Sequence, residues 1–197
     1  MSRQGEYSRK TKETEVYVSI EFNGQGSSVV KSGNSFFDHM LDLFTKHGKL
    51  NTEISCIGDT DVDFHHSAED IGMCLGTVVF KILGDHRGIK RYSSVYIPMD
   101  EALCRIVMDL SGRSNLVFNA EFTDSRVNDF ETPLVYDFFK AFCDNAKATM
   151  HIDLIRGNNT HHSVEAIFKA FGRVLDDAAS INPDASNAIP SSKGLIV

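Results

Sequence analysis

Two near-copies of one motif, His65-His66-Ser67-Ala68-Glu69 and His161-His162-Ser163-Val164-Glu165, begin at residues 65 and 161, an offset of 96. Four of the eight histidines of the 197-residue chain belong to these copies. If each copy lies on a helix, its first histidine and its glutamate share one face, and its second histidine points about 100° away. Each copy therefore offers metal ligands in two directions.

The segments around the motif are repeated as well. Apolar residues alternate from Val16 to Phe22 and again from Cys104 to Leu110, and a glycine-containing turn follows each run, which is typical of a half-buried strand. Both places continue with the same predicted elements: a return strand (29–30 and 116–122), a helix that begins at Ser35 or at Thr132-Pro133, a third strand (54–57 and 152–155), and a long helix from the motif. This order indicates an internal duplication.

The predicted fold class is α+β, with two duplicated strand-strand-helix-strand-helix halves that form one functional unit, residues 1–95 and residues 96–197 with a C-terminal substrate-binding tail. We expect the helices to pack on one face of the sheets, and the two sheets to lie side by side or edge to edge. Residues 1–10 are polar and are expected to be loose. A half-exposed sheet face with apolar content suggests a homo-oligomer.

Charge and composition exclude several classes of partner. The net charge of −7 and the pI of about 5.6 argue against binding to nucleic acid or to an anionic membrane, because both need concentrated Lys and Arg. The four cysteines include no CxxC pair and are interpreted as reduced core residues. The sequence shows no signal peptide and no long apolar run, so a soluble, cytoplasmic protein is expected.

The repeated motif predicts a metal site. Imidazole and carboxylate ligands without thiolate suit Mn, Fe, Zn or Ni, and two half-sites in a duplicated fold indicate two metals. A helix start with incidental histidines is the alternative, and the repetition in register disfavours it. His39 is a further ligand candidate, although it could be a buried packing residue, and Asp137 lies near the corresponding place but could be a solvated carboxylate.

An anionic ligand would need a local basic cluster in so acidic a chain. Guanidinium, ammonium and hydroxyl groups suit phosphate oxygens, and the candidates are Arg91, Arg113, Lys169, Ser191, Ser192 and Lys193. Each of the basic residues taken alone is more often a surface charge. The segment Ser191 to Gly194 is a tail that could complete the site of a neighbouring subunit.

Acid–base candidates are fewer. Glu13 lies just outside a predicted strand and is a candidate general acid/base, while its counterpart Glu101 could be structural. His47 is a weaker catalytic candidate, because a structural role is at least as plausible for it and for His151. Two other carboxylates, Asp63 and Asp70, could orient the metal-bound imidazoles.

Taken together, these residues resemble a known family. The matching segments are Phe37-Asp38-His39-Met40-Leu41, His65 to Asp70, Pro98-Met99-Asp100-Glu101-Ala102-Leu103, Asp109-Leu110-Ser111-Gly112-Arg113, His161 to Phe171, and Ser191-Ser192-Lys193-Gly194. They are similar, in order and from about Arg9 to the C-terminus, to the imidazoleglycerol-phosphate dehydratases.

The resemblance implies a hydro-lyase of histidine biosynthesis that converts imidazole glycerol phosphate to imidazole acetol phosphate, with two Mn²⁺ ions per subunit, in a 24-subunit shell with sites between subunits. By position, one metal would take His39, His66, His161 and Glu165. The other would take His65, Glu69, His162 and Asp137. Glu13 would contact the substrate as acid/base, His39 would also lie at the substrate, and the basic set with the tail serines would surround its phosphate.

The reaction explains why such a set is needed. The carbon-bound proton of the substrate is not acidic, so a carboxylate alone could not remove it. Two metals on the two ring nitrogens would favour an imidazolate, which helps to expel hydroxide, after which a base takes the carbon proton and the enol tautomerises to the ketone.

The sequence departs from the family pattern at four positions. Phe64 replaces a common aspartate before the first histidine pair, Asp137 stands where His or Glu is frequent, and Pro133 and Tyr136 replace residues that are usually acidic. These changes concern the second metal site more than the first. An alternative function is therefore a catalytically impaired metal-binding shell protein of the same fold, and a third is a phosphate-releasing hydrolase.

Overall fold

The chain is described by a computed structural model over residues 3–185 and 187–196. Each half contains three strands, a helix, a strand and a second helix. The first half comprises β1 (Gln4–Lys10), β2 (Thr14–Glu21), β3 (Ser27–Lys31), α1 (Ser35–His47), β4 (Asn51–Gly58) and α2 (His65–Leu83). The second comprises β5 (Tyr92–Met99), β6 (Ala102–Asp109), β7 (Asn115–Asn119), α3 (Pro133–Ala146), β10 (Thr149–Arg156) and α4 (Thr160–Ala179). The predicted internal duplication is thus confirmed.

Differences in loop length change the sequence offset between equivalent elements of the two halves. The first three strands of the two halves are related by an offset of 88, which rises to 98 at α3 and β10. The longer connection before α3 contains the small hairpin of β8 (Arg126–Val127) and β9 (Phe130–Glu131). After α4, a short 3-10 helix, η1 (Pro183–Ala185), begins the C-terminal tail.

Each half forms a four-stranded sheet with the same topology. The strand orders are β1-β2-β4-β3 and β5-β6-β10-β7. In each sheet the last pair, β3 with β4 and β7 with β10, is parallel, and the other pairs are antiparallel. A helix is the next element after β3, β4 and β10, and α3 follows β7 after the β8–β9 hairpin. In each half the two helices therefore begin at the same edge of the sheet.

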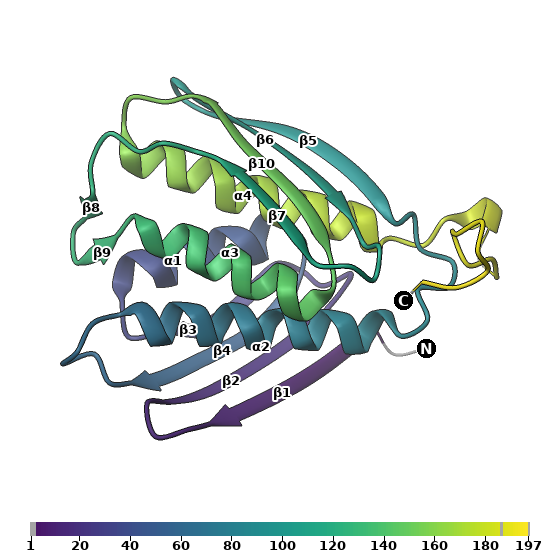
Figure 1. Cartoon of the computed structure of the whole chain (residues 1–197), viewed down its shortest axis with the longest axis horizontal. Helices are drawn as coiled ribbons and strands as arrows, with labels where there is room; N and C mark the ends of the chain where they lie inside the picture. The colour runs from purple at the N-terminus through teal and green to yellow at the C-terminus, as the bar shows by residue number, and fades with distance from the viewer. Residues whose placement is uncertain (1–2, 186, 197) are drawn as a thin grey trace.

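The helices form a layer between the two sheets (Figure 1). All four helices begin at one end of the molecule, and the N-terminus and the C-terminal tail lie at the opposite end (Figure 1). The expectation that helices cover one face of each sheet is confirmed. The expectation that the sheets lie side by side or edge to edge is wrong, because the apolar faces of both sheets and the helices bury one another in a common core.

The helices pair across the halves, α2 with α3 and α1 with α4. A Cβ atom added at Gly76 of α2 would collide with the carbonyl oxygen of Phe142 on α3, and one added at Gly172 of α4 would collide with that of Phe44 on α1. Gly76 and Gly172 are equivalent in the duplication, as are Phe44 and Phe142. The two halves are therefore related by a pseudo-two-fold arrangement that extends to the closest backbone contacts.

Residues 4–10 correct the expectation of a loose N-terminus, because they form the edge strand β1. Only Gly5, Tyr7 and Arg9 face the helix layer, and Tyr7 packs against the core. The outer face of an edge strand is solvated, so its polar sequence hides the strand. The equivalent strand β5 was also missed, and it spans the expected boundary between residues 95 and 96, so the second half begins at Tyr92.

The four cysteines are buried and free, as expected. Burial raises the pKa of the Cys74, Cys104 and Cys143 thiols to about 12. Within residues 3–185 and 187–196, none of the helices combines the length and the apolar character that crossing a membrane requires.

Candidate metal centre

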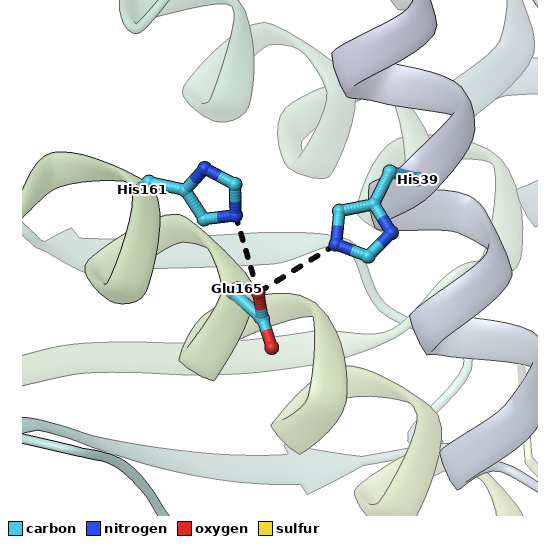
Figure 2. Close-up of side chains that lie close together, drawn as sticks. All are labelled: His39, His161 and Glu165. Carbon is cyan, nitrogen blue, oxygen red and sulfur yellow. Dashed lines mark ion pairs between the residues drawn. The ribbon is translucent and has the colours of Figure 1, made fainter.

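The first cluster of ligands lies where α1 meets α4. His39 comes from the first turns of α1, and His161 and Glu165 lie one turn apart on α4. The Nε2 atoms of His39 and His161 are 3.6 Å and 3.3 Å from Oε2 of Glu165. Figure 2 shows both rings turned toward this one oxygen. Ligand atoms of the three residues lie within 4.8 Å of one another, which is a spacing that one metal ion can span.

Glu165 is buried, and its other carboxylate oxygen is held by Lys169 one turn further along α4, at 2.6 Å from Nζ. Burial acts to raise the pKa of Glu165. The hydrogen bond and charge of Lys169, together with His39 and His161, outweigh it and bring the pKa below its usual value. The carboxylate is therefore ionised and ready to accept a cation.

The second cluster lies where α2 meets α3. His65 and Glu69 lie one turn apart on α2, and Asp137 lies on α3. The distance from His65 Nδ1 to Asp137 Oδ2 is 3.4 Å, and that from His65 Nε2 to Glu69 Oε2 is 3.9 Å. The ring lies between the two carboxylates and meets them with different nitrogens. One metal ion would require the ring to turn, so this cluster is less preformed than the first.

The two clusters are equivalent in the duplication. The offset of 98 that relates β4 to β10 also relates His39 to Asp137, and the offset of 96 relates His65 and Glu69 to His161 and Glu165. Each cluster thus contains one histidine and one glutamate from a long helix and one residue from the helix packed against it. The set of imidazole nitrogens and carboxylate oxygens suits a first-row divalent metal.

The second histidine of each motif points away from its cluster and is held by a carboxylate. His66 Nδ1 lies 3.1 Å from Asp59, and His162 Nδ1 lies 2.8 Å from Glu101. These hydrogen bonds raise the pKa of both imidazoles, and the pKa of Glu101 is lowered to about 2, first by His162. A carboxylate that accepts from Nδ1–H leaves Nε2 as the free ligand atom.

Asp59 and Glu101 were not predicted to orient the imidazoles. Asp63 and Asp70 were predicted for this role, and the structure corrects that prediction. Asp63 accepts a hydrogen bond from the backbone N–H of His65, and Asp70 binds Arg9 and Thr14. The sequence signal for Asp59 was weak, because this residue lies seven positions before His66, in the loop between β4 and α2 and outside the repeated motif.

Glu13 lies in the turn between β1 and β2, at the end of the molecule where the helices begin. Its carbonyl oxygen accepts a 3.0 Å hydrogen bond from the backbone N–H of Asp59, which places it beside the loop that holds His66. Its carboxylate takes part in none of the hydrogen bonds found among the described residues, and it is exposed. The equivalent Glu101 is bound by His162 and by the backbone N–H groups of Asn158 and Asn159.

An aromatic cluster fills the space between the two metal clusters. Phe130 of β9 stacks on Phe37 at 5.4 Å, and Phe36 lies 5.2 Å from the ring of His161. Phe64, which the family resemblance predicts to replace an aspartate, packs on Phe37 at 5.8 Å. The replacement is therefore accommodated by apolar packing, while the neighbouring Asp63 bonds the backbone at the start of α2.

The residues predicted to bind phosphate lie in two separate regions, one near the C-terminal tail and one at the first metal cluster. Arg91 binds Asp109 at 2.7 Å and donates to the carbonyl oxygen of Pro190 in the tail, so it lies with the tail at the far end of α4. The Lys193 amide donates to the Ser191 hydroxyl, and Ser192 lies between them in the same exposed tail, while Arg113 lies in the turn between β6 and β7. Lys169 lies instead at Glu165. Within one chain the basic set is therefore not brought together.

His47 ends α1, on the side that faces α4. Burial, followed by the charges of Lys169 and Arg173, lowers the pKa of the imidazole below its usual value. His151 lies on the outer, exposed face of β10, away from the helix layer and from both clusters. The structure therefore places His47 beside α4 and His151 away from both clusters of its own chain.

Comparisons with known proteins identify the family to which the chain is similar. Residues 32–175 match the family model described as imidazoleglycerol-phosphate dehydratase. The chain is 48% identical to the enzyme of that name from Methylobacillus flagellatus, over 98% of this chain and 97% of the other, and 50% identical to that from Oceanobacillus iheyensis, over 98% of each. It is similar to the crystal structure of the Staphylococcus aureus enzyme, with a TM-score of 0.81, 43% identity, and coverage of 90% of this chain and 100% of the other. It is also similar to the crystal structure of the Pyrococcus furiosus enzyme, with a TM-score of 0.82, 29% identity, and coverage of 95% of this chain and 99% of the other.

Proposed function

The chain belongs to the imidazoleglycerol-phosphate dehydratase family, and on this basis we propose that it dehydrates imidazole glycerol phosphate with the help of two metal ions held by the two clusters. The observation that carries the proposal is the convergence of His39, His161 and Glu165 on one point. Enzymes of this family act in histidine biosynthesis, and a phosphorylated imidazole is their substrate. The two-metal site and the roles of individual residues are the proposed part.

Each metal would take three ligands from one chain and a fourth from a neighbour. The first would be held by His39, His161 and Glu165, and the second by His65, Glu69 and Asp137. The remaining ligands, His66 and His162, already have Nδ1 engaged by carboxylates and would offer Nε2 outward to adjoining subunits. This division supports the assignment in which the two histidines of each motif serve different metals.

The position of the tail also supports sites between subunits. α4 is 20 residues long, so Arg91 and the tail lie about 25 Å from the metal end of the same chain. A small substrate cannot span that distance. We therefore propose that Arg91, Arg113, Ser191, Ser192 and Lys193 bind the phosphate of substrate held at the metal centre of a neighbouring subunit, near that subunit's Lys169 and His47. A 24-subunit shell, as the family resemblance implies, would provide such contacts.

The reaction removes a hydroxyl group from the carbon next to the ring and a hydrogen from the following carbon. When bound, Mn²⁺ would stabilise the ring as its anion. The ring N–H proton and the hydroxyl group of the first carbon would leave together as water, and the proton removed from the second carbon would return to the ring nitrogen. Glu13, whose carboxylate is exposed and unengaged beside the His66 loop, would accept the proton of the second carbon as a general base. The resulting enol then tautomerises to the ketone.

Chelation and reconstitution test the proposal. Protein stripped of metal by chelator should have no turnover of imidazole glycerol phosphate, and Mn²⁺ should restore it, as measured by the absorbance of the product in alkali. Failure of Mn²⁺ and of every other divalent ion to restore turnover would refute the enzymatic proposal. Metal binding with assembly but without turnover would favour the impaired shell protein, and release of inorganic phosphate would favour a hydrolase.

A further inference from the structure

The turn that carries Glu13 is fixed by a buried polar network from three separate elements. Asp70 of α2 is buried, and its Oδ2 accepts a hydrogen bond from Arg9 Nη1 of β1 at 2.5 Å and another from the hydroxyl of Thr14 at the start of β2. The two donors lie on either side of the turn that contains Glu13. Asp70 therefore links both ends of this turn to the helix that bears His65 and His66.

Hydrogen bonds within the turn extend the network. The backbone N–H groups of Glu13 and Thr14 donate to the Thr11 hydroxyl at 3.1 Å and 3.0 Å, and the Thr11 N–H donates to the Thr14 carbonyl oxygen at 2.8 Å. The carbonyl oxygen of Glu13 accepts from the N–H of Asp59, the residue that holds His66. The backbone of Glu13 is therefore tied on both sides, while its carboxylate remains unengaged.

The second half of the chain shows what the fold alone requires at these places. The strand pairing of β5 with β6 repeats that of β1 with β2, so the counterparts of Arg9 and Thr14 are Ile97 and Ala102, and the counterpart of Asp70 on α4 is Ala166. All three counterparts are apolar and pack in the core. The same sheet and helix thus assemble without a charge at this interface.

A partly buried ion pair contributes little to stability compared with apolar residues of similar shape, because desolvation offsets the attraction. The first half has the ion pair and the second half has apolar residues in its place. The two halves also differ in whether the carboxylate of the turn is bound by other groups. Glu101 is held by His162 and two backbone N–H groups and needs no further support. Within residues 3–185 and 187–196, the Glu13 carboxylate has no such hydrogen bonds to hold it.

We propose that Arg9, Thr14 and Asp70 are positioning residues that act through Glu13, holding its carboxylate in place at the metal centre. This inference rests on the proposed function of Glu13. It assigns to the Arg9–Asp70 pair a task in catalysis that is distinct from folding and from metal binding. General acid–base catalysis depends on such placement, and a displacement of about 1 Å can cost about 100-fold in rate.

The test replaces the network by the apolar set of the second half, in a swap variant that combines Arg9→Ile, Thr14→Ala and Asp70→Ala. We expect this variant to fold, with an unchanged or higher thermal midpoint, and to keep its metal content. The amides of residues 11–14 should exchange hydrogen faster than in the unchanged protein. Its kcat should fall by about 100-fold with little change in KM.

Combination with Glu13→Gln separates positioning from a general effect. If the network acts through Glu13, the swap should cause no further loss of kcat in the Glu13→Gln background, since the two changes disable one function. Asp70→Asn, whose amide oxygen can still accept both hydrogen bonds, should keep most of kcat. Lys10→Ala is the matched control, because it removes the exposed Lys10–Glu15 pair of the same hairpin and should change neither exchange nor kcat.

Four results would overturn the inference: a swap variant that does not fold, unchanged amide exchange in the turn, an unchanged kcat, or a loss that multiplies with that of Glu13→Gln. Failure of the proposed function gives a different result. In that case the unchanged protein with Mn²⁺ shows no dehydration at all, while amide exchange in the turn still reports whether the network holds it.

Discussion

The two halves of the chain have the same fold, and both contribute residues to each candidate metal cluster, but they differ in one turn. In the first half the turn residue Glu13 is exposed and its carboxylate is unengaged, whereas the equivalent Glu101 in the second half is bound by His162 and by backbone N–H groups. His66 is held by Asp59 instead, from the neighbouring loop. Assigning the orienting role to Asp59 leaves Glu13 free for chemistry.

If the proposed function holds, this difference teaches that duplication supplied the metal ligands and divergence supplied the acid/base. Metal binding needs the same parts twice, and each half provides a histidine pair, a glutamate and one residue from the adjoining helix. Acid–base chemistry needs a single free carboxylate. Of the two equivalent turn carboxylates, Glu101 is engaged, whereas that of Glu13 has no hydrogen bond among the described residues, and a polar network fixes its turn.

The largest expected effect concerns the buried glutamate of the first cluster. Glu165→Gln removes the charge on which His39 and His161 converge, so we expect the Mn²⁺ affinity of that site to fall by more than the roughly 100-fold that outer partners can cost, and turnover to be lost. Metal content per chain after dialysis measures this. Glu69→Gln is the matched change in the second cluster, and if either variant keeps two metals per chain at native affinity, the assignment of that cluster is wrong.

The next effect concerns the carboxylates behind the outward histidines. Asp59→Ala and Glu101→Ala should each lower Mn²⁺ affinity by about 10- to 100-fold, because the imidazole loses the partner that fixes its orientation. Titration of stripped protein with Mn²⁺ measures this loss. Asp144→Ala, which removes an exposed pair with Lys140, is the control and should bind Mn²⁺ normally. Equal affinity in all three variants would contradict the orienting role.

A smaller effect is expected at Asp137, where the halves differ most in their ligands. Asp137→His gives the second cluster the residue that His39 supplies in the first, and an imidazole reaches further than the short carboxylate. We expect the weaker Mn²⁺ site to tighten by about tenfold, which corresponds to about 1.4 kcal/mol. A weaker site in this variant would show that Asp137 is already the better ligand.

The smallest effect is on the pH dependence of stability in metal-free protein. The pKa of Glu101 is lowered from 4.5 to about 2, so its contribution is present above pH 4.5 and is lost as the pH falls toward 2. The pKa of His162 is raised above 6.5, so its contribution is present below pH 6.5 and is lost as the pH rises through the raised value. Glu101→Gln should lower the thermal midpoint slightly between these limits, and by less near pH 9, where the charge of His162 is lost but the hydrogen bonds from Asn158 and Asn159 remain.

Much of the fold could be predicted from the sequence, because the elements that face the core carry clear periodicity. The runs from Val16 and from Cys104, and the helices that begin at His65 and His161, were placed correctly for this reason. β1 was missed because an edge strand with one solvated face has a polar sequence. The layering was missed because periodicity shows which face is apolar but not what covers it.

The site was predictable to the extent that its residues are repeated. The histidine pairs, His39, Asp137 and the glutamates follow from the duplication. The structure brings the first histidine of each pair together with the other residues in two clusters, and the second histidine points away. Asp59 was missed because its role depends on a loop packing against the next helix. The separation of Lys169 from Arg91 was also missed. It depends on the tail folding back to Arg91 at the far end of α4, and the sequence does not show that contact.

The most direct test of the difference between the halves compares Glu13→Gln with Glu101→Gln at saturating Mn²⁺, with kcat and metal content measured on both. We predict that Glu13→Gln keeps two metals per chain and loses about 10²- to 10⁴-fold in kcat. Glu101→Gln should need more Mn²⁺ but should recover most of kcat once the sites are filled. A Glu13→Gln variant with unchanged kcat, or one whose loss is matched by Glu101→Gln at saturation, would contradict the account.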